Sequence, residues 1–198
     1  MPDERVEIRQ AGPDQLSALA TVFGSAFVAE PMMRWPLGEQ PDVAEQCIRC
    51  FTYFLEPALE LGIVWATPDA KGAAVWVPPD VAETWEEHPW NQARISALSD
   101  DGGERYDAFW DWVYSHVPDE ELWQLDTIAV EPASQGRGLG RALIDAGLKK
   151  ARASGTGAFL STGTPRNLEI YRRSGFRVVD EADAPGGGPR IWFMRWDP

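Results

Sequence analysis

Residues 134–143, SQGRGLGRAL, combine residue types that can hold a phosphate group. Small and larger residues alternate at the centre of this stretch: Gly136, Arg137, Gly138, Leu139 and Gly140. A strand-like segment precedes the loop, and a helix-prone run follows it. Unhindered backbone N–H groups at a helix N-terminus form a site for an anionic diphosphate, to which Arg137 and Arg141 would add charge. The alternative is a glycine-rich turn that only reverses the chain, and we favour the diphosphate site.

Two familiar phosphate-binding loops do not fit this stretch. A dinucleotide fingerprint needs G-x-G-x-x-G near the first strand and an acidic residue about 20 positions later. Here the glycines recur at every second position, and the loop lies two-thirds along the chain. A Walker A loop needs Gly-Lys-Ser/Thr, which this sequence does not contain. The pyrophosphate of coenzyme A remains as the candidate ligand.

The composition limits the classes of function. The 198 residues carry a net charge of −13, which argues against a nucleic-acid partner because phosphate binding needs a basic face. An acidic surplus is compatible with a cationic substrate, although it usually reflects only a well-solvated surface. The sequence has a charged start and no apolar run of about 18 residues, so we expect no signal peptide and no membrane partner. The cytoplasm is the expected compartment.

Cysteine and histidine residues predict no metal site. Cys47 and Cys50 form C-x-x-C, but no second pair completes a zinc site. His88 and His116 are isolated in the sequence. We expect the cysteines to pack on an apolar helix face.

Apolar residues at helical spacing predict the helices that must position the loop. They cover residues 12–28, 43–61, 80–121 (interrupted at SDDGGE), 141–154 and 165–175. Asp14 is a candidate N-cap of the first helix, and Gly155 and Gly175 would end the last two. The three prolines of residues 29–42 predict a loop.

Strands are predicted where apolar residues alternate or run continuously. They lie around Val6 and Ile8, on both sides of a turn at 68–72, and at 122–130, 157–163, 176–182 and 190–196. No internal repeat or second-domain boundary interrupts residues 1–198, so we expect a single domain. The predicted class is α/β or α+β, with a mixed sheet flanked by helices.

Two motifs together resemble the GNAT acetyltransferase superfamily. The stretch AVEPASQGRGLGRALI resembles its acyl-CoA-binding motif Q/R-x-x-G-x-G/A, with Gln135, Gly138 and Gly140 at the fixed positions. Downstream, AFLSTGTPRNLEIYRRSGF is similar to the superfamily's next strand and helix, with the ending Asn-x-x-x-Tyr-x-x-x-Gly-Phe. The resemblance implies one GNAT-like domain, a mostly antiparallel mixed sheet, and acetyl-CoA as the co-substrate.

The whole chain looks most like the puromycin N-acetyltransferase branch, closely after Trp123 and loosely over residues 80–121. One departure is the strand before the loop, which carries Gln124 and Asp126 where apolar or small residues are expected. The acceptor pocket is therefore expected to differ from that of the branch.

The resemblance also implies roles in thioester chemistry. An amine attacking a thioester needs a proton for the departing thiolate, and Tyr171 would be that acid. Ile128, Ala129 and Val130 would offer backbone groups to pantetheine, and one N–H would polarise the thioester carbonyl. Asn167 would bond the cofactor's polar arm. The alternative for Tyr171 is an aromatic residue that only packs in the core.

The residue that takes the amine's proton is less determined. Strict alternation in WQLDTIAV places four residues on one face: Gln124, Asp126, Ile128 and Val130. Asp126 is the carboxylate among them, and it could act directly or through water. Equally open are an anchor for the substrate ammonium and a solvated strand end. Glu30 is a second candidate for holding a cation, or else an exposed loop acid.

The predicted acceptor is the amine of a small molecule, such as an antibiotic or aminonucleoside. Residues 30–35, with Glu30 and Trp35, and the tryptophan-rich residues 80–121 are the expected specificity segments, with Gln124 at the pocket. One alternative is acetylation of a protein lysine or N-terminus, and another is an acyl-CoA-binding module without catalysis. Either a monomer or a homodimer fits the sequence.

Overall fold

A computed structural model describes residues 6–39, 41–86 and 92–198. Its centre is a seven-stranded sheet in the order β1-β2-β3-β4-β5-β7-β6. The strands are β1 (Arg9–Gln10), β2 (Val64–Ala66), β3 (Gly72–Val77), β4 (Trp123–Val130), β5 (Ala158–Thr162), β6 (Arg177–Asp183) and β7 (Arg190–Trp196). Neighbouring strands are antiparallel except for β4 and β5, which run parallel. The predicted mixed, mostly antiparallel sheet is confirmed.

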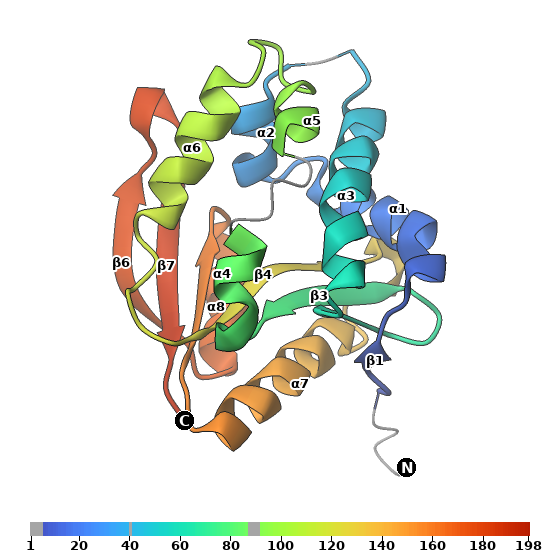
Figure 1. The fold of residues 1–198 in the computed structure, drawn as a ribbon, viewed down its shortest axis with the longest axis vertical. Coiled ribbons are helices and arrows are strands. Elements are labelled where there is room, and N and C mark those ends of the chain that lie inside the picture. The colour runs from blue at the N-terminus through green and yellow to red at the C-terminus, as the bar shows by residue number, and fades with distance from the viewer. Residues whose placement is uncertain (1–5, 40, 87–91) are drawn as a thin grey trace.

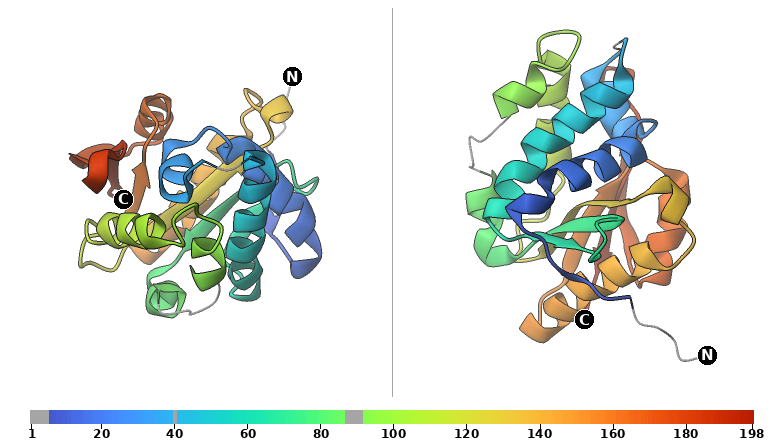
Figure 2. Two further views of the ribbon diagram at one scale, coloured as in Figure 1. Left: turned by 90° about the horizontal axis from the view of Figure 1, so that it is seen from above. Right: turned by 90° about the vertical axis from the view of Figure 1, so that its right-hand side faces the viewer.

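Helices cover both faces of this sheet (Figure 1). They are α1 (Leu16–Phe27), α2 (Pro31–Leu37), α3 (Val43–Glu60), α4 (Pro79–Glu86), α5 (Gln92–Ser96), α6 (Glu104–Tyr114), α7 (Leu139–Ser154) and α8 (Pro165–Arg173). Short 3₁₀ turns lie at Pro13–Gln15, Pro132–Ser134 and Pro185–Gly187. Both Figure 1 and Figure 2 show α7 on one side of β3 and β4, with α1 and α3 stacked on the other.

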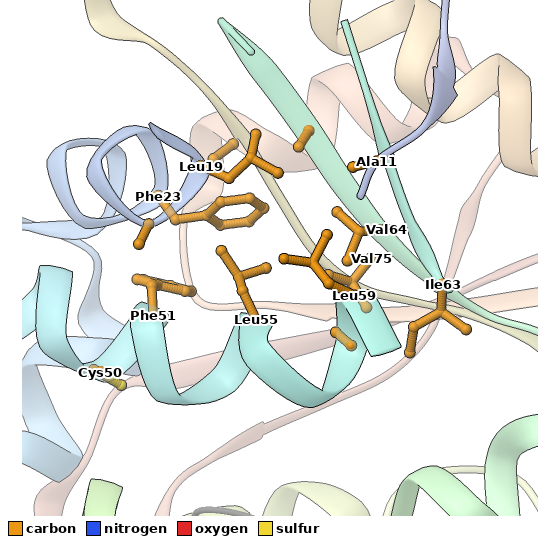
Figure 3. Packing of buried hydrophobic residues seen from close by; sticks show 14 of the residues in the cluster. Ala11, Leu19, Phe23, Cys50, Phe51, Leu55, Leu59, Ile63, Val64 and Val75 are labelled. Carbon is orange, nitrogen blue, oxygen red and sulfur yellow. The ribbon is translucent and has the colours of Figure 1, made fainter. Parts of the chain in front are cut away.

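The central strand β3 is buried on both faces because it is apolar in every position. On β3, Val75 and Val77 pack under α1 and α3, whereas Ala74 and Trp76 pack with α7. In the first of these layers, Phe23 of α1 and side chains of α3 face β2 and β3 (Figure 3). Burial of such side chains contributes about 1.5–3 kcal/mol each, which fixes α1 and α3 against the sheet.

A third cluster lies under α6. Phe109 and Val113 of this helix pack against Phe159 of β5 and Phe193 of β7. Met32 of α2 belongs to the same cluster. Within the insertion between β3 and β4, α6 is therefore docked over β5 and β7, whereas Trp85 of α4 and Ile95 of α5 pack with the cluster of α1 and α3.

Three predicted elements differ from the structure. Residues 29–42 were expected to form a loop, but α2 forms there because Pro31 occupies its first turn and Met33 and Leu37 are buried. Asp14 is not the N-cap of α1, since a 3₁₀ turn containing it precedes that helix. Val6 and Ile8 lie outside the first strand, which is only Arg9–Gln10.

The helical segment predicted over 80–121 is shorter in the structure: its described helices are α4, α5 and α6, and residues 115–121 are not helical. The other predicted helices and strands lie near their expected places, and Gly155 caps α7 as predicted. His88 falls outside the described residues. Within the described residues, no single helix is long and apolar enough to cross a membrane; one pair bent by 92°, Pro13–Phe27 with Pro31–Leu37, passes by length and composition only.

Candidate active site

The parallel strands β4 and β5 separate after a short contact. They pair at Trp123 with Ala158 and at Gln124 with Phe159. Beyond this point a cavity of about 1520 Å³ is lined by β4, the glycine loop, α7 and α8 on one side and by α1, α3, α4 and α6 on the other. A single cavity thus contacts both the predicted cofactor segment and the variable helices.

The glycine cradle, residues 135–141, forms the turn from β4 into α7. Gly136 and Gly138 have φ of 76° and 84°, the left-handed region that favours glycine. Gly138 is the N-cap of α7 and supplies no side-chain hydrogen bond to the first turn. The space in which a Cβ would stand is open at both glycines. Exposed N–H groups and open space fit the diphosphate of coenzyme A.

The two arginines of the cradle lie in different surroundings. Arg141 Nε donates to both carboxylate oxygens of Asp145 at 2.8 and 2.9 Å, and its Nη1 donates to the Arg173 carbonyl at 2.8 Å. Arg141 lines the cavity, but its guanidinium already joins α7 to the end of α8. Arg137 is exposed and does not line the cavity.

A β-bulge interrupts β4 in front of the cradle. On β3, Val75 pairs with Thr127. The next residue, Trp76, pairs with Leu125. Asp126 is the extra residue between them, and such bulges reorient a side chain next to many active sites.

The bulge separates residues that strict alternation would place together. Ile128 and Val130 pack with the cluster under α7. Asp126 instead bonds Trp85, which belongs to the cluster under α1 and α3. The prediction of one shared face is therefore wrong for the set Gln124, Asp126, Ile128 and Val130. All four still line the cavity, as do Ala129 and Gln135.

Asp126 has a carboxyl that titrates near neutral pH. Burial raises its pKa to about 6, and the hydrogen bond from Trp85 Nε1 to Oδ2 at 3.0 Å opposes this rise. In the described part of the chain, Oδ1 has no hydrogen-bond partner. The pKa and the unbonded oxygen are the properties of a general base.

Tyr171 lies on α8, is buried and lines the same cavity. Burial raises the pKa of its phenol, and the negative charge of Glu30 raises it further. The phenol therefore keeps its proton through neutral pH, as a general acid requires. Asn167, one turn earlier, also lines the cavity, and its Nδ2 donates to Thr162 Oγ1 at 3.4 Å.

Glu30 joins α2 to α8. The Thr164 hydroxyl lies 2.6 and 2.7 Å from its two carboxylate oxygens and donates its proton to them. Burial raises the pKa of Glu30, and the Thr164 hydrogen bond opposes that rise. The carboxylate lines the cavity and acts electrostatically on Tyr171. Glu30 is therefore part of the site and not an exposed loop acid.

Five aromatic side chains of α3, α4 and α6 also line the cavity and are called the aromatic wall: Phe54, Trp85, Tyr106, Trp110 and Tyr114. Trp110 Nε1 and Thr127 Oγ1 are buried cavity-lining atoms with no partner in the described part of the chain. Trp35 does not line the cavity; its ring lies against the backbone near Gly188 and under Arg105.

The cysteines and His116 are the described residues of the types that most often bind zinc. Cys47 and Cys50 are buried free thiols, and burial raises the pKa of both. Cys50 lines the cavity as a neutral thiol. His116 stacks on Phe193. The described residues include no cluster of His, Cys, Asp and Glu able to hold a metal ion.

Sequence reasoning missed Thr164, and it missed the hydrogen bond between Trp85 and Asp126. Thr164 lies 134 residues from Glu30, and Trp85 lies 41 residues from Asp126. Residues so far apart in the sequence leave no local pattern that predicts their contact. The tryptophans of residues 80–121 pointed to a wall of the acceptor pocket, but not to a bond with Asp126.

Comparison with known proteins agrees with this geometry. Residues 76–176 match the model of the Acetyltransferase (GNAT) family. A Mycolicibacterium gilvum mycothiol acetyltransferase is 32% identical over 115 residues, which are 53% of this chain and 36% of that protein. A Rhodococcus erythropolis mycothiol acetyltransferase is 39% identical over 71 residues, 33% of this chain and 24% of that protein. The chain thus matches about a third or less of the length of these relatives.

Solved structures share the fold over nearly the whole chain. A Corynebacterium glutamicum protein described as histone acetyltransferase HPA2 and related acetyltransferase has a TM-score of 0.65 at 20% identity, covering 96% of this chain and 95% of that one. A PaiA N-acetyltransferase from Thermoplasma acidophilum, in complex with coenzyme A, has a TM-score of 0.59 at 12% identity, covering 97% and 98%. With the family match over the cradle, β4 and α8, these findings establish that the chain belongs to the GNAT acetyltransferase family.

Proposed function

We propose that the protein transfers the acetyl group of acetyl-CoA to the amine of a small molecule, by direct attack in a ternary complex. The observation that carries this proposal is one cavity lined by the glycine cradle, by Asp126 and Tyr171, and by the aromatic wall. Acetyl-CoA and the amine can therefore bind next to each other in this cavity. We take residues 1–198 as one catalytic domain, since the described strands form one sheet.

Acetyl-CoA is the acetyl donor of the GNAT family and supplies a thioester. In this proposal the backbone of Ile128, Ala129 and Val130 binds the pantetheine arm, and the glycine cradle (Gln135, Gly136, Arg137, Gly138, Leu139, Gly140 and Arg141) binds the diphosphate. Asn167 bonds the polar arm. The capless N-terminus of α7 supports this arrangement, because its N–H groups need acceptors.

Tyr171 donates a proton to the departing thiolate in this proposal. Its phenol is neutral at physiological pH because burial and Glu30 both raise its pKa. A thiol has a pKa of about 8.5, so a positioned acid makes the sulfur a better leaving group.

Asp126 receives the proton of the attacking amine. Its carboxylate is ionised above a pKa of about 6, so it is available as a base at neutral pH. The free Oδ1 provides the accepting atom, directly or through one water. An acceptor that arrives as an ammonium ion is drawn first to this carboxylate and to that of Glu30.

The acceptor in this proposal is a small amphipathic amine. The aromatic wall offers surface for a flat or apolar body. Gln124 lines the same region. Aminonucleosides of the puromycin type are candidates from the sequence resemblance, and mycothiol-related amines are candidates from the names of the relatives.

A panel of acceptors tests the proposal. Release of CoA thiol is followed with aminonucleosides, arylalkylamines, polyamines, a mycothiol-related amine, and peptides carrying a lysine or a free N-terminus. Turnover with a small amphipathic amine is the expected result. Efficient acetylation of peptides alone would replace the proposal by protein acetylation. Binding of acetyl-CoA without turnover of any amine would leave a binding module.

A further inference from the structure

Trp85 is the one side chain in the described residues that hydrogen-bonds the Asp126 carboxylate. Its indole Nε1 donates to Oδ2 at 3.0 Å. An indole N–H is a donor only, so this bond forms with an accepting carboxyl oxygen and favours the ionised form. The bond joins α4 of the insertion to the bulge of β4.

The ring of Trp85 is held rigidly enough to orient that bond. Trp85 is 2% exposed and belongs to the cluster under α1 and α3. Phe54 of α3 packs against it edge to face, with ring centroids 5.2 Å apart and planes at 90°. A side chain locked by packing can fix the direction of its hydrogen bond.

We propose that Trp85 is a positioning residue for Asp126, which anchors one carboxylate oxygen and leaves the other for the proton of the acceptor amine. This inference rests on the proposed role of Asp126 as base. The residue that orients the base then lies in α4, outside the segment that resembles the cofactor motif.

Neighbouring titratable groups do not supply the same effect. Tyr106 of α6 interacts electrostatically with Asp126 and with Cys50 of α3, and burial raises the pKa of both the phenol and the thiol. Both groups are therefore neutral around pH 6. Tyr114 and Asp107 also act on Tyr106, and Asp107 accepts a hydrogen bond from Ser96 at 2.7 Å. Of Asp126, Tyr106 and Cys50, Asp126 is the group that changes charge near pH 6.

The first test compares pH profiles of kcat/KM for the full chain and Trp85→Phe, with the best amine of the panel. Loss of the N–H donor disfavours the carboxylate and so raises the pKa of Asp126. The acid limb, the fall of kcat/KM at low pH, is therefore expected to move to higher pH by about one unit, a tenfold change in the ionisation constant. Activity recovers toward the wild-type value at pH 8.5. A residue that only fills space would lower the rate at every pH and leave the limb in place.

Trp123→Phe is the matched control. Trp123 lies on the same strand as Asp126 and also loses an indole hydrogen bond, to Ser154 Oγ at 3.2 Å, but it does not line the cavity. Its acid limb is expected to stay at the wild-type pH. An equal shift in both variants would overturn the inference.

A measurement on the unaltered protein covers the case in which Trp85→Phe does not fold. The assigned indole N–H resonance of Trp85 is followed by ¹⁵N NMR between pH 4.5 and 8. It is expected to titrate near pH 6 and to stop titrating in Asp126→Asn. A flat Trp85 resonance overturns the inference.

Asp126→Asn separates this inference from the proposed function. If that variant removes the acid limb while Trp85→Phe leaves it unmoved, the base stands and the positioning role of Trp85 is overturned. If the limb persists in Asp126→Asn, the base assignment itself fails and this inference fails with it.

Discussion

The glycine cradle and the aromatic wall line the same cavity but are built in different ways. The cradle is one run of seven residues, and its groups available for binding are backbone N–H groups at the start of α7. The aromatic wall consists of separate side chains: one from α3, one from α4 and three from α6. The first surface depends on local conformation, and the second depends on how three helices pack.

This difference indicates which part of the protein sets specificity. Backbone donors bind a diphosphate whatever side chains surround them, so the cradle suits a ligand shared by a whole family. The aromatic wall and the carboxylates of Glu30 and Asp126 bind through side chains, so a substitution at any of these positions changes the binding surface. Acceptor choice is therefore expected to vary between relatives while the cofactor stays the same.

The largest expected effect comes from Tyr171, which lines the same cavity as the two surfaces. Tyr171→Phe keeps the ring but removes the acid, so kcat should fall by about 10² to 10⁴-fold when chemistry limits the rate. Affinity for acetyl-CoA, measured by calorimetry, should stay within about twofold. Tyr53→Phe, on a ring outside the cavity, is the matched control. Near-normal turnover would remove Tyr171 from the mechanism.

The second prediction concerns pH and the acceptor side. Because the Asp126 carboxyl has a pKa of about 6, kcat/KM should fall about tenfold per pH unit below it. Ionisation of Asp126 has the opposite effect on stability: it raises activity but lowers the free energy of unfolding. A carboxyl whose pKa is raised by folding costs stability once it ionises, so Asp126→Asn should raise the unfolding midpoint at pH 8 and change it little at pH 4. A lower midpoint at pH 8 would contradict the burial of this group.

The third prediction isolates the cradle. Gly140 is the second residue of α7 and has an ordinary φ, and a Cβ there would meet Val130 Cγ2 at 3.8 Å, an ordinary contact. Gly140→Val should therefore fold but place a branched side chain, larger than the alanine that the family motif accepts, on the cradle. We expect the Kd for CoA to rise about tenfold, the equivalent of one good hydrogen bond.

Gly147 is the matched control on the same helix. A Cβ there would overlap the ring of Trp76 in the core. Gly147→Ala should lower the free energy of unfolding by about 1–3 kcal/mol, while CoA affinity of the folded fraction stays normal. If Gly140→Val binds CoA as the wild type does, the cradle assignment is wrong.

The smallest expected effect concerns the contact between α2 and α8. Thr164→Val removes the hydroxyl that bonds Glu30 and keeps the side-chain shape. The pKa of Glu30 should rise further, so KM for a cationic acceptor at neutral pH should rise about threefold. A neutral acceptor of similar shape should be less affected. An equal change for both acceptors would mean that Glu30 does not hold the cation.

Local sequence determined the cofactor half of the molecule. A strand, glycines able to adopt positive φ, and a helix start are properties of neighbouring residues, so the cradle and α7 could be predicted from the printed sequence. The same holds for the strands buried on both faces and for α3, whose apolar stripe has a clear helical period. The residue Tyr171 was predicted by resemblance, and the structure brings it to the cavity.

Tertiary structure decided the acceptor half. The bulge at Asp126 arises from the register of β3 against β4, which no pattern within β4 reveals. Burial of Met33 and Leu37 turned a proline-rich segment into α2, and that helix carries Glu30 to Thr164. Trp85 reaches Asp126, and Trp35 is kept from the cavity, only through the packing of the helices. Contacts between residues far apart in the chain depend on the completed fold, because their pairing has no local energetic signal.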